Sequence, residues 1–292
     1  MKMEYFPAGG GTALVFNDTG SRLLVTEAEG LSEAGVEPVT VSSPGQYGET
    51  ATDIKVGPRA ITLSIAYAGN GYGEAVAQRR LVARAFFSPP PRRGDAPAMA
   101  LLRCYPQDLP PVELQVIPSH GPAVEEVGPG AWRAEVELTA PYPYWRETSE
   151  RVDALQLQGG WTLPMTFPIA LAPYEAQAVV TNTGNVPVGV LIRLYGNATV
   201  PRLRNLTTGE VLEIGGNIPS TTYAEIDTHF GRKAVDIVDA NGARTRLMYR
   251  LNLARADFWQ IQPGVNTIRF EADVLSPEAR ATITWRPEIS GL

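Results

Sequence analysis

The residues best suited to metal binding or thiol chemistry are two histidines and one cysteine. His120 and His229 lie far apart in the sequence, and neither has another histidine or a cysteine nearby. A zinc site would therefore need further ligands of another type. Cys104 lies in a strand-like run, where a free cysteine acts as a small buried apolar side chain. We predict no metal site and no internal disulfide.

Glycine-rich and acidic segments form no recognisable phosphate-binding or catalytic motif. Residues 9–12 lack the lysine of a phosphate-binding loop and predict a flexible N-terminal arm. Residues 69–73 precede a predicted helix whose amides could hold an anion, but a strand-to-helix turn explains them without a ligand. No serine lies in a Gly-x-Ser-x-Gly elbow, and Glu125 and Glu126 are expected in a solvated loop. The sequence therefore predicts no catalytic residue, no cofactor-binding residue and no cofactor.

Three tryptophans are the remaining candidates, because an aromatic ring can stack on the face of a sugar. They are Trp161, Trp259 and Trp285. Trp161 lies near a predicted domain boundary and is expected to be the most open of the three.

The composition indicates a folded, acidic protein. Its 292 residues correspond to about two domains, and 44% hydrophobic with 19% charged residues argues against disorder. A net charge of −6 gives no overall positive field toward nucleic acid or an anionic membrane. No signal peptide and no apolar run of about 20 residues is recognised, so we expect no membrane insertion and synthesis in a cytoplasm.

The first half predicts a β-sandwich or split barrel with one helix. Short runs with period-two alternation predict strands: 22–26, 36–41, 53–56, 60–65, 98–105, 112–117 and 132–140. Residues Glu74–Phe87 predict a helix. Its expected apolar stripe consists of Leu81, Val82, Ala85 and Phe86.

The second half predicts an antiparallel sandwich of many short strands. Asn241-Gly242, between two strand-like runs, predicts a two-residue hairpin turn. Between the halves, prolines and aromatics at 141–145 are followed by the charged run 146–153. Because proline and glycine end sheet ladders, we predict two domains here, 1–150 and 151–292.

Several short motifs, taken in order, resemble the distal tail protein family of long-tailed, siphophage-type bacteriophages. They cover the second half densely and the first half loosely. The motifs are Pro141-Tyr142-Pro143-Tyr144-Trp145, Gly159-Gly160-Trp161, Phe167-Pro168, Asn182-Thr183-Gly184-Asn185, Gly196-Asn197, residues 205–210, Ile226-Asp227-Thr228, Phe258-Trp259, residues 263–266 and Thr284-Trp285.

The resemblance implies an all-β fold, with a galectin-like antiparallel β-sandwich (jelly roll) as the second domain. It places Trp259 and Trp285 in strand cores, where they pack rather than bind sugar. No His/Asn/Arg/Trp cluster of the galectin type is recognised, so the galectin-like shape would serve as a scaffold only.

The resemblance also implies a structural virion protein of the tail tip and no enzymatic activity. Such proteins form a ring, commonly a homohexamer, that joins the tail tube to the baseplate hub. DNA crosses the lumen, and tip or receptor-binding proteins dock on the second domains. We expect the helix Glu74–Phe87 and the loop Ser43–Gly48 to supply ring contacts or line the lumen. The alternative is a lectin-like module that binds host glycans directly, and a glycan hydrolase is a weaker one.

Overall fold

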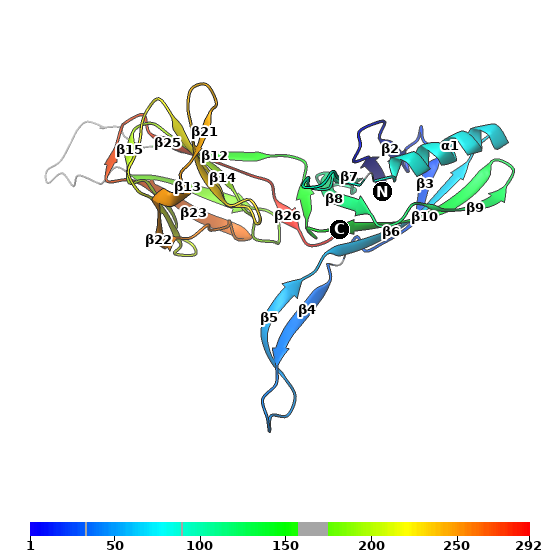
Figure 1. Ribbon diagram of the computed structural model, residues 1–292, viewed down its shortest axis with the longest axis horizontal. Coiled ribbons are helices and arrows are strands. Elements are labelled where there is room, and N and C mark those ends of the chain that lie inside the picture. The colour runs from blue at the N-terminus through cyan, green and yellow to red at the C-terminus, as the bar shows by residue number, and fades with distance from the viewer. Residues whose placement is uncertain (33, 89, 157–174) are drawn as a thin grey trace. The chain divides into compact units, whose positions relative to one another are not determined.

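The chain, described here from a computed structural model that covers all residues except 33, 89 and 157–174, forms two compact units. One comprises Met1–Ser149 with Ile289–Leu292, and the other comprises Glu150–Glu288. Strands dominate both units, and the described residues contain one α-helix (Figure 1). The prediction of an all-β fold with one helix is therefore confirmed.

The first unit is built on one long antiparallel sheet. Its main path runs, in spatial order, through β2 (Leu14–Phe16), β1 (Lys2–Phe6), β7 (Ala100–Tyr105), β8 (Val112–Pro118), β10 (Ala131–Ala140), β6 (Arg59–Ala68) and β3 (Leu23–Glu29). Two strands join it from the side: β9 (Ala123–Gly128) pairs with β10, and β11 (Trp145–Glu147) pairs with β8. The last strand of the chain is β26 (Glu288–Ile289).

Alternation along the strands creates the core of this unit. Leu63 on β6 and Val136 on β10 are opposite each other in the register and fully buried, while their chain neighbours point to the other face. The helix α1 (Tyr72–Ala85) covers the buried face, and the indole of Trp132 donates a hydrogen bond to the carbonyl of Ala75 at 3.1 Å. Cys104 is buried in this core, as predicted.

The helix begins and ends two residues earlier than predicted. Three members of its predicted apolar stripe are buried, namely Val82, Ala85 and Phe86. The fourth, Leu81, is 41% exposed, so its assignment to the stripe was wrong. Leu81 directly precedes Val82, and adjacent positions on a helix point about 100° apart, which places Leu81 off the buried face.

The second unit is an antiparallel sandwich. One sheet runs β12 (Arg151–Gln156), β25 (Arg280–Trp285), β14 (Leu191–Tyr195), β19 (Tyr223–Asp227), β20 (Ala234–Val238) and β21 (Arg244–Arg246). The other runs β13 (Glu175–Asn182), β23 (Gly264–Glu271), β16 (Arg202–Asn205), β17 (Val211–Ile214) and β22 (Leu251–Ala256). A small sheet contains β18 (Asn217–Ile218), β15 (Ala198–Thr199) and β24 (Val274–Leu275), and a 3-10 turn spans Met248–Arg250.

The inward residues of both large sheets form one apolar core. Trp259 and Trp285 belong to it and are 1% and 3% exposed, and the Trp259 indole donates to the carbonyl of Leu203 at 3.2 Å. The packing role expected for these two tryptophans is confirmed. Trp161 lies outside the described residues. The galectin-like detail of the sandwich stays a prediction.

Three local predictions were wrong. Residues 9–12 are not an arm, because β1 precedes them and they connect β1 to its partner β2. Glu125 and Glu126 lie on β9 rather than in a loop. The Asn241-Gly242 turn is longer than two residues: β20 ends at Val238, β21 begins at Arg244, and the Asp239 carboxylate accepts from the amides of Asn241 and Ala243. A side-chain acceptor at the start of the loop stabilises this wider turn.

Candidate interaction surfaces

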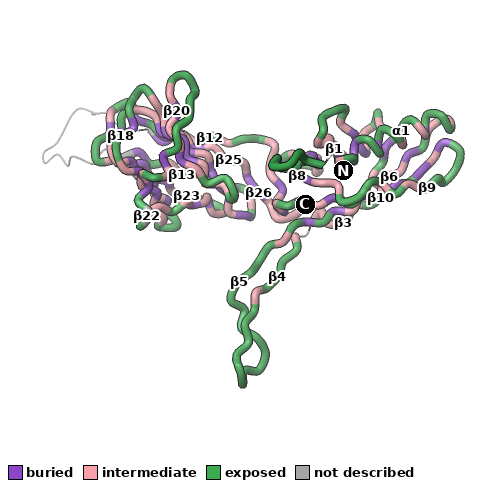
Figure 2. The backbone as a smooth tube through the Cα atoms, viewed as in Figure 1, coloured by how far each residue is buried: buried purple, intermediate pink, exposed green. Residues whose placement is uncertain are grey.

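A two-stranded hairpin extends from the first unit and is exposed along almost its whole length (Figures 1 and 2). It consists of β4 (Val36–Val41) and β5 (Thr50–Val56), which pair only with each other. The predicted loop Ser43–Gly48 forms its tip, where Gly45 adopts a positive φ of 86° and the amide of Gln46 donates to the Ser43 carbonyl. Isolated hairpins are at best marginally stable in water. This hairpin is therefore a candidate contact surface, because a contact with another surface would stabilise it.

The hairpin has one apolar and one charged face. Val36 is opposite Val56 and Pro38 is opposite Ile54, and because side chains alternate, these four share a face. Val36 is 62% and Ile54 is 64% exposed. We call these four residues the apolar hairpin face. The opposite face carries the pair Glu37–Lys55 and Asp53. An apolar face presented to water in this way marks a contact surface.

A second surface lies on the side of the long sheet that faces away from α1. Across β3, β6 and β10, Glu29, Thr62 and Glu137 form one row, and Glu27, Ser64 and Glu135 form the next. Glu125 on β9 lies opposite Arg133, the one arginine among these residues. All five glutamates are exposed. We call them the acidic face: Glu27, Glu29, Glu125, Glu135 and Glu137.

The helix contributes exposed residues but no built site. Its first turn is tied down, because the Glu74 carboxylate accepts from Arg22 at 2.9 Å and from the Asn70 amide at 3.2 Å. Tyr72 and Leu81 stay exposed. Residues 69–71 form a strand-to-helix turn, whereas Tyr72 and Gly73 already belong to α1. The helix stays a candidate for ring contact.

In the second unit, Glu225 is a covered carboxylate held by two arginines. Its Oε2 accepts from the Nε of Arg193 at 2.9 Å, and its Oε1 lies 2.6 Å from a guanidinium nitrogen of Arg244. Burial alone raises the pKa of Glu225, but the hydrogen bonds from Arg193 and Arg244 outweigh it and hold this pKa below its usual range.

We expect Glu225→Gln to lower the free energy of unfolding at neutral pH by about 1–3 kcal/mol, because both arginines lose a charged acceptor. A carboxyl group whose pKa is lowered on folding stabilises the fold above its unfolded pKa, and that contribution is lost as the pH falls through the folded value. The difference between variant and wild type should therefore vanish in acid. Urea unfolding across pH measures it, with the exposed Glu278→Gln as control. A difference that persists in acid would contradict the ion-pair explanation.

The residues considered for chemistry do not come together. His120 is exposed and its Nδ1 lies 3.3 Å from Glu137, while the Nδ1 of His229 lies 2.6 Å from Asp227 in a turn. Burial raises the pKa of the Cys104 thiol to about 12. In the part of the chain that the structure describes, no group of three or more potential ligands is placed to hold a metal ion. Within the same ranges, no helix is long and apolar enough to cross a membrane.

Sequence reasoning missed a buried arginine, Arg59, at the start of β6. Its guanidinium donates to the backbone carbonyls of Pro143 at 2.7 Å and of Gly30 and Leu31 at 2.8 Å each, and also to that of Ser290. It also lies 6.0 Å from the ring centroid of the buried Trp145. This arrangement joins segments that are distant in the sequence, and no local pattern indicates it.

Comparison with known proteins supports the predicted resemblance. Residues 183–288 match the family model of the siphovirus-type tail component, C-terminal domain. The resemblance of the second unit to distal tail proteins is thereby confirmed. No curated protein sequence matches the chain.

A solved structure of a phage protein shares the fold over nearly the whole chain. The SPP1 Dit protein, described as a paradigm of the hub adsorption apparatus in Gram-positive infecting phages, is 16% identical with a TM-score of 0.64. The match covers 97% of this chain and 98% of that one. The phage P2 baseplate in its activated conformation with Ca is 12% identical with a TM-score of 0.49, over 97% of both chains. At 16% identity the likeness to the SPP1 Dit protein concerns the fold.

Proposed function

We propose that the chain is a distal tail protein, a structural component of a phage tail tip that forms a ring between the tail tube and the baseplate hub. The family match over residues 183–288 is the observation that carries this proposal, and a shared fold over 97% of the chain supports it. The protein acts in the virion and has no catalytic role. We expect six copies in the ring and assembly in the host cytoplasm.

The first domain, residues 1–150, closes the ring. A head-to-tail interface between identical subunits produces a closed ring when its rotation permits. The apolar hairpin face suits such a contact, because every subunit carries it and its apolar side chains are exposed in the single subunit. Neighbouring subunits would bury it.

The acidic face suits the wall of the lumen. Five glutamates and one arginine, Arg133, give this face a negative field. Its centre on β6 carries only the small side chains of Thr62 and Ser64. A negative wall repels the phosphates of DNA that passes through and prevents it from adhering. DNA is therefore a transient passenger rather than a specific ligand.

The second domain, residues 151–292, docks tip or receptor-binding proteins. Direct glycan binding is the weaker interpretation, because Trp259 and Trp285 are buried in the core and cannot stack on a sugar. Trp161, the third candidate, lies outside the described residues.

Negative-stain microscopy of the purified chain tests the ring, together with immunogold labelling of the virion with antibodies against this chain. We expect rings with a central hole and label at the tail end that carries the tip. Label elsewhere on the particle would overturn the proposal. Monomers in solution combined with label at the tip would overturn only autonomous ring closure, since some rings close on a preformed tip.

A further inference from the structure

The outward face of the sheet that contains β25, β14, β19, β20 and β21 presents arginine and tyrosine side chains. Arg280, Tyr195 and Tyr223 are neighbours in one row of the register. Arg193, Glu225, Asp236 and Arg246 form the next row. Arg244 follows on β21, opposite Val238. We call the exposed and half-buried arginines and tyrosines of this surface the arginine–tyrosine face: Arg193, Tyr195, Tyr223, Arg244, Arg246 and Arg280.

On this face the carboxylates lie beneath the guanidinium groups. The side chains of Glu225 and Asp236 are only 8% and 14% exposed, while Arg244 is 55% and Arg246 is 62% exposed. Arg246 donates to Asp236 at 2.8 Å, so the arginines are held in place by the acids that they cover. An approaching molecule meets hydrogen-bond donors and positive charge, although the whole chain carries a net charge of −6.

Aromatic rings extend the same surface. The ring centroids of Tyr195 and Tyr223 lie 5.1 Å apart, and the guanidinium of Arg280 lies 4.8 Å from the Tyr195 centroid. Arg280 is exposed. Tyrosine offers a large contact area with little loss of conformational entropy, and tyrosine and arginine are enriched at the energetic centres of protein interfaces.

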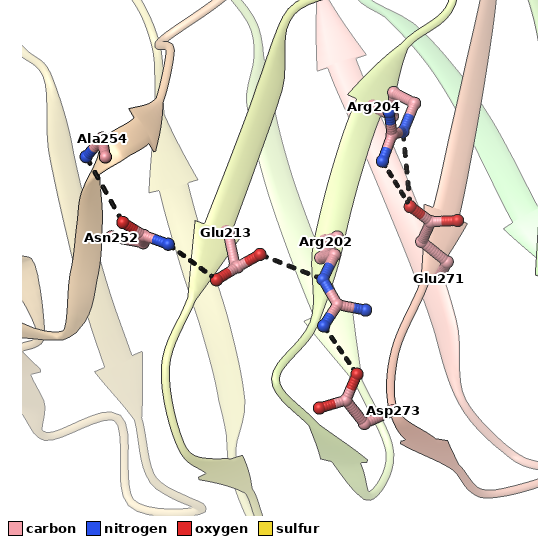
Figure 3. A network of polar contacts seen from close by, with 7 residues as sticks. All are labelled: Arg202, Arg204, Glu213, Asn252, Ala254, Glu271 and Asp273. Carbon is pink, nitrogen blue, oxygen red and sulfur yellow. Dashed lines mark hydrogen bonds and ion pairs between the residues drawn. The ribbon is translucent and has the colours of Figure 1, made fainter.

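The other sheet of the same unit provides a contrast. Its polar ladder consists of Arg202, Arg204, Glu213, Asn252, Glu271 and Asp273, with an ion pair of 2.6 Å between Arg202 and Asp273 (Figure 3). Here Asp273 is 51% exposed and Arg202 only 25%. The ladder contains three acids against two arginines, and with Arg269, which lies opposite Arg204, the charges balance, so this face has no excess of positive charge.

We infer that the arginine–tyrosine face binds an extended acidic segment of a partner protein. Guanidinium groups supply hydrogen-bond donors only, and one guanidinium can donate two parallel hydrogen bonds to one carboxylate. The face crosses five strands, a span of about 19 Å, which about six extended residues would cover. This inference names the chemistry of the docking site in the proposed function, and it rests on that function only in supposing that the second unit meets other proteins.

The test uses the full chain and a short fluorescently labelled peptide of alternating glutamate and glycine, with binding followed by anisotropy at low and at physiological salt. Arg246→Ala with Arg280→Ala should weaken binding about tenfold or more. The matched control, Arg202→Ala with Arg204→Ala, removes the same two charges from the ladder and should change affinity by less than about twofold. Circular dichroism verifies folding, and single Arg280→Gln serves if the double variant unfolds.

Three outcomes would overturn the inference: no peptide binding by the wild type, an equal loss in both double variants, or stronger binding of an oligouronate with the same variant dependence. The last would assign the face to an acidic glycan. The two proposals can fail separately. If the chain binds the peptide but is absent from the tail tip, the ring proposal fails and the inference about the arginine–tyrosine face holds.

Discussion

Polar substitution of the apolar hairpin face should abolish ring formation. The variant combines Val36→Thr, Ile54→Thr and Val56→Thr, which keeps β-branched side chains in both strands. These residues are 62%, 64% and 40% exposed in the single subunit, so a partner would bury them and gain about 25 cal/mol per Å² of apolar area. Light scattering and negative-stain microscopy should show monomers at concentrations where the wild type forms rings.

The charged face of the same hairpin supplies the control. Glu37→Gln with Lys55→Gln alters two residues that are opposite each other in the register and lie on the other face of the hairpin. This control should form rings with the wild-type yield. As monomers, both variants should have the melting temperature of the wild type, because almost no hairpin residue is buried in a core. Rings from the threonine variant, or equal loss in the control, would show that the apolar hairpin face is not the contact.

The strands were predictable where one face is buried. Trp132, Ala134, Val136 and Leu138 are buried, and the intervening residues of β10 are exposed or half-buried, as the alternation indicated. The hairpin strands 36–41 and 53–56 were also recognised, because β-branched residues favour extended backbone in either setting. Their pattern does not show what the apolar face contacts, because the same alternation occurs in a strand packed on a core and in a strand whose apolar face is exposed.

The missed features depend on contacts between segments distant in the sequence. The helix boundary and the Asn241-Gly242 turn shifted by a few residues, because local preferences are decided finally by packing and by side-chain acceptors such as Asp239. The side chains of the arginine–tyrosine face come from four of the five strands that it crosses, and only the register brings Arg280 beside Tyr195. A single arginine in a sequence reads as a surface residue, and Arg59 shows how far this can mislead.

Arg59→Leu should destabilise the first unit by about 3–5 kcal/mol, the usual loss when one partner of a buried charged network is removed. The leucine fills part of the volume but removes the guanidinium bonds to four buried or half-buried carbonyl groups, of which that of Leu31 still accepts from the indole of Trp145. Burial lowers the pKa of Arg59, yet an arginine remains charged near neutral pH. Thermal unfolding should show a transition lowered by about 10 °C, while the exposed Arg80→Leu should leave it nearly unchanged.

Removal of residues 289–292 provides an independent check on the same network. Arg59 donates to the Ser290 carbonyl, and the hydroxyl of Ser32 donates to the Leu292 carbonyl at 2.8 Å, so these residues are fastened to the first unit by hydrogen bonds. If Arg59 acts by holding this segment, the losses from Arg59→Leu and from the truncation should overlap and sum to less than their independent values. Strict additivity would mean that Arg59 stabilises the unit through Pro143, Gly30 and Leu31 alone. Arg59→Lys should not restore the stability, because one ammonium group cannot reproduce the planar fork that reaches four carbonyls in three segments.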